Sequence, residues 1–144
     1  MIKLNKYLRE IGIDEDYWLF KEQNSKNPDP RYLPDEEGFV DAEFFSLDTS
    51  LSLYIYSHLC YFREYCLYGY SCYFSERYKE RAGDKWKEIL DKMIEAFKLL
   101  IIEDTSYKDS LGEKKKQYLL SKNKAKKIKY GMRLFIKYYQ DLWY

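Results

Sequence analysis

The side chains best suited to nucleophilic chemistry are one histidine and three cysteines near the middle of the chain. His58 is the only histidine among 144 residues, and Cys60, Cys66 and Cys72 are spaced six residues apart. A cysteine nucleophile needs a base within hydrogen-bond reach. In a helix, residues 58 and 60 point apart and residues 58 and 66 lie two turns apart. We therefore expect His58 to be a buried structural residue.

The remaining candidates for catalysis or metal binding are carboxylates. Asp41, Glu43 and Asp48 could gather around Mg²⁺ or serve as acid and base, but Asp41 and Asp48 stand where helix N-caps are expected. The chain has no GxGxxG, GxxxxGK[ST] or HExxH motif. The cysteine spacing does not fit a zinc site and indicates reduced thiols. We expect a protein that is not an enzyme and that has no metal and no cofactor.

Charge is divided along the chain, although 25 Lys and Arg nearly balance 24 Asp and Glu. Residues 29–48 hold seven carboxylates and one arginine, whereas residues 114–129 hold eight lysines and no acid. Clustered lysines favour a phosphate backbone or an acidic protein as partner. The alternatives are that the acidic segment imitates a phosphate backbone, or that the two segments neutralise each other within the fold. The basic candidates for binding a partner or nucleic acid are Lys114, Lys115, Lys116, Lys122, Lys124, Lys126, Lys127 and Lys129, and the acidic candidates are Asp35, Glu36, Glu37, Asp41 and Glu43.

Tyrosine is unusually frequent, with 17 copies, of which eight lie between residues 54 and 78. One helix face cannot bury them all. Tyrosine offers rigid contact area and is enriched at interface hot spots, so this segment is either an exposed binding surface or an unusually aromatic core. The candidates for aromatic contact with a partner are Tyr65, Tyr68, Tyr70, Tyr73 and Tyr78.

Helical periodicity runs through nearly the whole chain and predicts an all-α fold, a single-domain bundle of five or six helices over residues 1–144. The clearest helix is expected from Asp84, as its N-cap, to residue 104. In it Trp86, Ile89, Leu90, Met93 and Phe97 fall on one apolar stripe. A long final helix should contain the lysine run and the apolar residues up to 143. Gly131 lies inside it and should weaken it locally, unless a neighbouring helix needs the space.

The other expected elements are shorter or less regular. The segment 47–68 is too long for a strand and predicts a helix. Two short helices are expected at residues 2–11 and 14–23. All three prolines lie within residues 24–38, which predicts a loop there. No apolar stretch approaches the roughly 20 residues of a membrane span, and we expect a soluble protein with no membrane contact.

Three blocks, which cover about a quarter of the chain, carry a resemblance. They are GFVDAEFFSLD at 38–48, WKEILDKMIEAF at 86–97 and GMRLFIKYYQDLW at 131–143. In this order they resemble a group of small uncharacterised proteins of tailed phages and prophages. The resemblance implies a phage origin, and with it the cytoplasm of an infected host cell, but no particular activity.

Three functions remain open at this point. The first is a phage-encoded interaction protein that inhibits a host defence system, such as an anti-CRISPR, by binding a host defence protein or ribonucleoprotein. The second is a nucleic-acid- or nucleotide-binding module that contacts RNA or DNA through the lysine-rich C-terminal helix. The third is a virion assembly factor that works as an oligomer. The sequence leaves the oligomeric state open.

Overall fold

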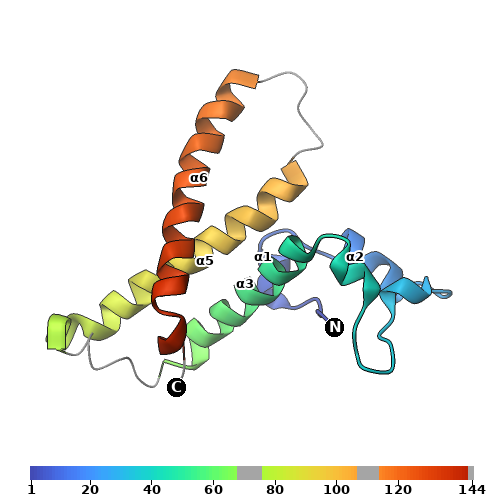
Figure 1. The fold of residues 1–144 in the computed structure, drawn as a ribbon, viewed down its shortest axis with the longest axis horizontal. Helices are drawn as coiled ribbons and strands as arrows, with labels where there is room; N and C mark the ends of the chain where they lie inside the picture. The colour runs from blue at the N-terminus through green and yellow to red at the C-terminus, as the bar shows by residue number, and fades with distance from the viewer. Residues whose placement is uncertain (68–75, 107–113, 143–144) are drawn as a thin grey trace. The chain divides into compact units, whose positions relative to one another are not determined.

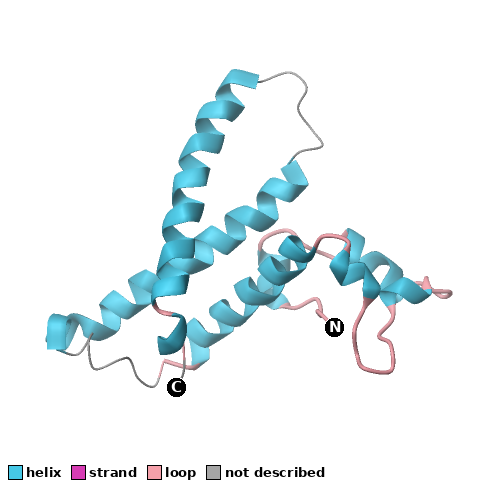
Figure 2. Ribbon diagram, in the orientation of Figure 1, coloured by secondary structure: helices cyan, strands magenta, loops and turns pink. Residues whose placement is uncertain are grey.

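The computed structural model of the chain describes residues 1–67, 76–106 and 114–142, which form helices joined by loops and turns (Figure 1). Side chains are described in these ranges except at residues 103–106 and 114–121. No strand occurs among these residues (Figure 2), so the prediction of an all-α fold is confirmed. The α-helices are α1 Lys6–Glu10, α2 Trp18–Lys21, α3 Leu47–Tyr65, α5 Ala82–Ser106 and α6 Lys114–Lys137, and the 3₁₀ helices are Glu22–Asn24, Pro30–Tyr32, Asp41–Phe44, Lys79–Arg81 and Tyr139–Asp141.

The chain forms two compact units, Met1–Ser57 and His58–Tyr144. The first unit has six Lys and Arg against twelve Asp and Glu, and the second has nineteen against twelve, so their formal charges are −6 and +7. Helix α3 runs continuously across the boundary. A single domain for the whole chain stays a prediction.

Short helices and turns build the first unit. Asn5 caps α1, because its side-chain oxygen accepts hydrogen bonds from the backbone N–H groups of Tyr7 and Leu8. The chain then turns at Gly12, whose φ of 91° lies in the left-handed region that glycine adopts readily. The core of this unit is apolar, and its most deeply buried large side chains are Leu8, Leu19, Phe20, Val40 and Leu53.

The segment predicted as a loop lies in the same unit. Between residues 24 and 38 the only regular element is the 3₁₀ turn Pro30–Tyr32, in which Asp29 accepts a hydrogen bond from the backbone N–H of Arg31. The 3₁₀ helix at residues 41–44 has Val40 at its N-cap position, without a side-chain cap. The expectation that Asp41 is a helix cap is therefore wrong.

Helix α5 holds the core of the second unit. Trp86, Ile89, Leu90, Met93 and Phe97 are all buried, which confirms the apolar stripe predicted from their spacing. The helix begins at Ala82, two residues before the predicted cap Asp84, because the 3₁₀ turn Lys79–Arg81 leads directly into it. Asp84 lies in the first turn, where its charge favours the helix dipole.

Helix α6 crosses α5 closely at Gly131 (Figure 1). A Cβ atom at this position would collide with the Cβ of Ala96 and would lie 2.5 Å from the carbonyl oxygen of Lys92. Of the two alternatives for Gly131, the structure shows the one in which a neighbouring helix needs the space. After Gly131, two residues of the C-terminal segment contact rings of α5. The rings of Phe97 and Phe135 and those of Trp86 and Tyr138 meet edge to face, with centroids 5.2 and 5.8 Å apart.

Candidate functional site

Five cationic side chains of α6 form a row along one side of the helix. At 100° per residue they fall within about 80° of the helix circumference, and Gly131 lies on the opposite side. The row therefore points away from the face that packs on α5. The row spans fifteen residues of the helix, which corresponds to a length of about 22 Å along its axis. We call this row the basic stripe, and its members are Lys122, Lys126, Lys129, Arg133 and Lys137.

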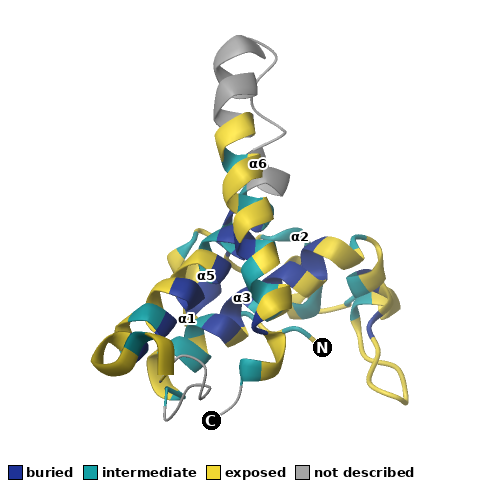
Figure 3. Cartoon of the chain, turned by 60° about the vertical axis from the view of Figure 1, so that its left-hand side comes forward, coloured by how far each residue is buried: buried dark blue, intermediate teal, exposed yellow. Residues whose placement is uncertain are grey.

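All five residues of the basic stripe are exposed (Figure 3). Helix α6 has no Asp or Glu along its whole length, Lys114–Lys137. Within the described part of the chain, no carboxylate forms an ion pair with a stripe residue. Lys137 contacts the ring of Tyr138, with its Nζ atom 5.2 Å from the ring centroid. Among the described residues, the stripe thus presents positive charge to solvent without an ion-pair partner, in a form suited to a polyanion.

The lysines predicted from the sequence divide into three groups. Lys122, Lys126 and Lys129 belong to the basic stripe, whereas the exposed Lys127 and the half-buried Lys124 lie on other sides of α6. The side chains of residues 114–116 are outside the described part. Sequence reasoning missed Arg133 and Lys137, because it followed a run of lysines instead of the helical spacing that continues beyond it.

The acidic candidates belong to the first unit, and two of them have structural partners. The Asp35 carboxylate accepts hydrogen bonds from the backbone N–H groups of Glu37 and Phe39, at 2.9 and 2.8 Å, and holds the turn that contains Gly38. Glu43 is half-buried and accepts a 2.6 Å bond from the backbone N–H of Ile2. Asp35 is exposed despite these bonds, and the other exposed candidates are Glu36, Glu37 and Asp41.

A further ion pair lies at the start of the acidic segment. The guanidinium of Arg31 contacts Asp29 at 2.5 Å, and together with the hydrogen bond from the Arg31 backbone it lowers the pKa of Asp29 to about 2. The Asp29 charge is therefore compensated locally. The negative charge that a partner could contact comes from the carboxylates of residues 36–48.

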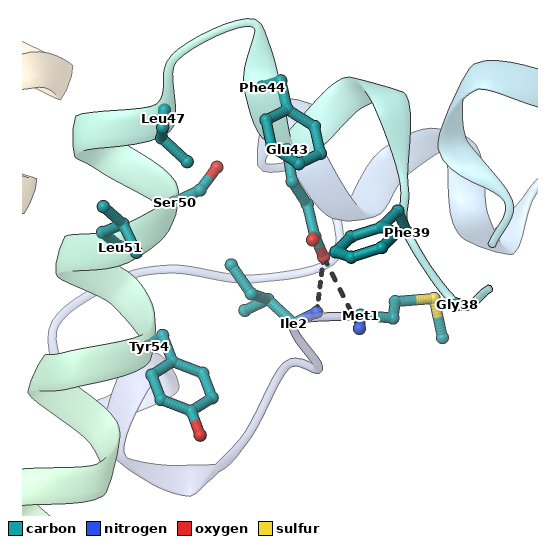
Figure 4. Close-up of a pocket in the computed structure, with 10 residues that line it drawn as sticks. All are labelled: Met1, Ile2, Gly38, Phe39, Glu43, Phe44, Leu47, Ser50, Leu51 and Tyr54. Carbon is teal, nitrogen blue, oxygen red and sulfur yellow. Dashed lines mark hydrogen bonds and ion pairs between the residues drawn. The ribbon is translucent and has the colours of Figure 1, made fainter. Parts of the chain in front are cut away.

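A pocket of about 340 Å³ opens beside this acidic segment (Figure 4). Its lining is largely apolar and half exposed, and the Glu43 carboxylate and the Ser50 hydroxyl are its main polar groups. Ser50 is 2% exposed, and its hydroxyl has no hydrogen-bond partner among the described residues. The apolar side chains around the opening are Met1, Ile2, Phe39, Phe44, Leu47, Leu51 and Tyr54.

The tyrosine candidates lie only partly in the described chain. Tyr65 is 47% exposed at the end of α3, and its ring centroid lies 4.8 Å from that of Tyr61, which is 54% exposed. Tyr78 is half-buried, and the Arg77 guanidinium lies 5.4 Å from its ring centroid. Tyr68, Tyr70 and Tyr73 fall outside the described residues.

The candidates for nucleophilic chemistry are arranged differently from expectation. His58 is exposed, so the prediction of a buried histidine is wrong: α3 packs through Leu53, Tyr56 and Leu59, and His58 lies on the opposite side. Cys60 and Cys66 are half-buried, and neither forms a disulfide within the described part of the chain. Cys72 is outside the described residues.

Two properties of the described residues bear on metals and membranes. Among them, no three His, Cys, Asp or Glu side chains lie close enough together to hold a metal ion. No helix in this part of the chain combines the length and the apolarity that a membrane crossing requires.

Comparison with protein-family models, with curated proteins and with solved structures gives no match. The resemblance to phage proteins therefore stays a prediction from the sequence.

Proposed function

We propose that the protein is a non-enzymatic binding protein that contacts the phosphate backbone of nucleic acid through the basic stripe of α6. The observation that carries the proposal is the alignment of five exposed cations on one face of a helix without an acid. A duplex presents one phosphate for about every 1.7 Å of its axis. A row of about 22 Å therefore faces more phosphates than it has cations, and each stripe residue can neutralise one.

The surroundings of the stripe support contact with the phosphate backbone of a nucleic acid more than recognition of its base sequence. Tyr130 is 53% exposed and lies between Lys126 and Lys127 around the helix, where its ring can stack on an unpaired base or lie along a groove wall. No carboxylate of α6 would be brought close to the phosphates. Affinity should consequently depend strongly on salt and weakly on sequence.

The test is a titration of a fluorescently labelled RNA hairpin and a labelled DNA duplex with the protein, followed by anisotropy at about 50 mM and about 200 mM salt. The stripe variant replaces Lys122, Lys126 and Lys129 by Gln. The control variant removes the same charge from exposed lysines elsewhere in the second unit, Lys79, Lys87 and Lys92. Circular dichroism of both variants checks that the helices are intact.

The stripe variant should lose at least about tenfold in affinity at the lower salt concentration and the control variant less than about threefold, because one phosphate contact is lost with each stripe lysine. Equal losses in the two variants would show that only net charge matters and would contradict the role of the stripe. Absence of binding by the unaltered protein to either nucleic acid would refute the proposal.

As the biological role, we propose inhibition of a host defence system by occupation of a nucleoprotein. The observation that favours a nucleoprotein is the segregated charge, −6 in the first unit and +7 in the second. A nucleoprotein offers anionic nucleic acid to the basic stripe and a basic, nucleic-acid-binding protein surface to Glu36, Glu37 and Asp41. The two surfaces of this chain match both components.

Affinity purification of the tagged protein from its host, with and without nuclease, tests this role. A defence nucleoprotein should be recovered, and its yield should fall when Glu36, Glu37 and Asp41 are replaced by Lys. Asp35 is left unchanged, because its carboxylate holds a turn. Recovery without any defence component would refute the inhibitory role and would leave the nucleic-acid contact to its own binding test.

A further inference from the structure

The solvent side of α3 is apolar where a surface helix normally carries charge. Six side chains on one face of this helix are exposed, and five of them are large hydrophobic or aromatic residues that are 47–54% exposed. The opposite face buries Leu53 and Tyr56 in the core. We call the exposed row the α3 seam, and its members are Leu47, Leu51, Tyr54, His58, Tyr61 and Tyr65.

The spacing along the seam has the repeat of a coiled coil. The steps between consecutive seam residues are four, three, four, three and four, an alternation that follows the 3.5-residue repeat of a coiled coil. At this spacing a helix presents an unbroken row to a second helix that wraps around it. Because α3 is one continuous helix from Leu47 to Tyr65, this spacing is a property of the helix alone.

We infer that the α3 seam binds the α3 seam of a second copy of this chain. A symmetric pair uses the same surface on both partners, and the seam has no Lys, Arg, Asp or Glu that such pairing would bury. Large side chains have about 200 Å² of surface. Half-exposed, the six residues offer about 600 Å² per copy and about 1,200 Å² per pair, which reaches the lower limit for a specific interface.

Charge selects the antiparallel orientation of the pair. Residues 35–48, which carry Asp41, Glu43 and Asp48, directly precede or begin the helix. Parallel pairing would bring the two acidic segments together, whereas antiparallel pairing separates them by about the length of the seam, roughly 27 Å. The two-fold axis then passes near residue 56, and Leu51 of one copy faces Tyr61 of the other.

This orientation also places aromatic side chains opposite the pocket of the first unit. Leu47 and Leu51 line that pocket, and beside them Phe44 is 54% exposed. In the antiparallel pair, Tyr61 and Tyr65 of the second copy face this end of the seam. Each copy thereby covers apolar surface of the other on both halves of the seam.

Charge-swap variants of the full chain test the inference by light-scattering mass and by sedimentation equilibrium. Leu51→Lys and Tyr61→Glu each place an unpaired charge in the pair, and each should raise the dimer dissociation constant at least about tenfold. The double variant sets the introduced ammonium of one copy opposite the introduced carboxylate of the other, so dimerisation should be restored to within about threefold of the unaltered chain. Glu64→Lys, exposed outside the seam, should leave the mass unchanged.

Each result either supports or overturns the pairing. The inference would be refuted if the unaltered protein is a monomer at about 200 μM, because this concentration lies well above the dissociation constants of specific interfaces. A dimer that survives both single substitutions would place the interface elsewhere. If the single variants are monomeric and the double variant is too, the antiparallel register is wrong, since positions 51 and 61 would not face each other. Circular dichroism and thermal unfolding of each variant show that the monomer is folded.

Discussion

Gly131 of α6 lies so close to Ala96 of α5 that a methyl group at position 131 would overlap the Ala96 Cβ atom. The carbonyl oxygen of Lys92 would be 2.5 Å from the same methyl group. Glycine is the poorest ordinary helix former, so its presence inside a 24-residue helix is explained by this contact. The crossing fixes which side of α6 faces α5 and therefore which side carries the basic stripe.

Gly131→Ala should lower the free energy of unfolding by at least about 1 kcal/mol, because backbone atoms of α5 must move to admit the methyl group. Helix propensity alone predicts the opposite, a gain of about 1 kcal/mol. Asn123→Ala, at an exposed position of the same helix, serves as the control and should raise stability slightly. Urea unfolding followed by circular dichroism gives both values, and a stabilised Gly131→Ala protein would show that the helices are not in contact there.

The ion pair between Arg63 at the end of α3 and Asp91 of α5 should contribute little to stability. Its atoms Nε and Oδ1 are 2.6 Å apart, but the side chains are 37% and 53% exposed. Water screens such pairs, and a double-mutant cycle of Arg63→Gln and Asp91→Asn should give a coupling energy below about 1 kcal/mol. The coupling should shrink further at about 1 M salt. A coupling of several kcal/mol, insensitive to salt, would mean that the pair is shielded from water.

The parts of the fold that the sequence predicts best are those with one apolar face. In α5, Trp86, Leu90 and Met93 are apolar while most of the intervening positions are charged, so the periodicity identifies both the helix and its buried side. The prolines located the irregular segment 24–38 equally well. Helix ends were less accurate, because the 3₁₀ turn before Ala82 extends α5 upstream of the expected cap.

Helix α3 shows where sequence reasoning fails. Both of its faces carry apolar or aromatic residues, so periodicity could not tell that Leu53 and Tyr56 are buried while Leu51 and Tyr54 are exposed. The expected burial of His58 failed for the same reason. The heptad-like spacing of the exposed face was visible in the sequence, but only the structure shows which of the two rows faces the core.

Asp29 should titrate well below an ordinary aspartate. Its pKa is lowered from 3.8 to about 2, chiefly by the hydrogen bonds from the Arg31 side chain and then by that from the Arg31 backbone. A group whose pKa is depressed in the folded state adds stability above the unfolded pKa and loses it as the pH falls through the folded pKa. The contribution of Asp29 is therefore complete above about pH 4 and disappears between about pH 4 and about pH 2.

A carboxyl-detected NMR titration of the protein measures this pKa directly. In Arg31→Gln the pKa of Asp29 should rise toward 3.8, although the backbone bond from residue 31 keeps it somewhat lower. Lys26→Gln changes the same amount of charge nearby and should leave the Asp29 pKa almost unchanged. An Asp29 pKa that is the same in the unaltered protein and in Arg31→Gln would show that the guanidinium does not stay on the carboxylate in solution.

Binding of duplex DNA should weaken steeply with salt if the basic stripe contacts phosphates. If five phosphates are neutralised, a plot of the logarithm of the association constant against the logarithm of the salt concentration should have a slope of about −4.5. The association constant should then fall about 500-fold between about 50 and about 200 mM salt. Lys126→Gln should make the slope shallower by about one, because one fewer counterion is released. Lys87→Gln, on α5 and outside the stripe, should leave it unchanged. A slope near zero, or an equal change for the two variants, would show that the contact with DNA does not run through this face of α6.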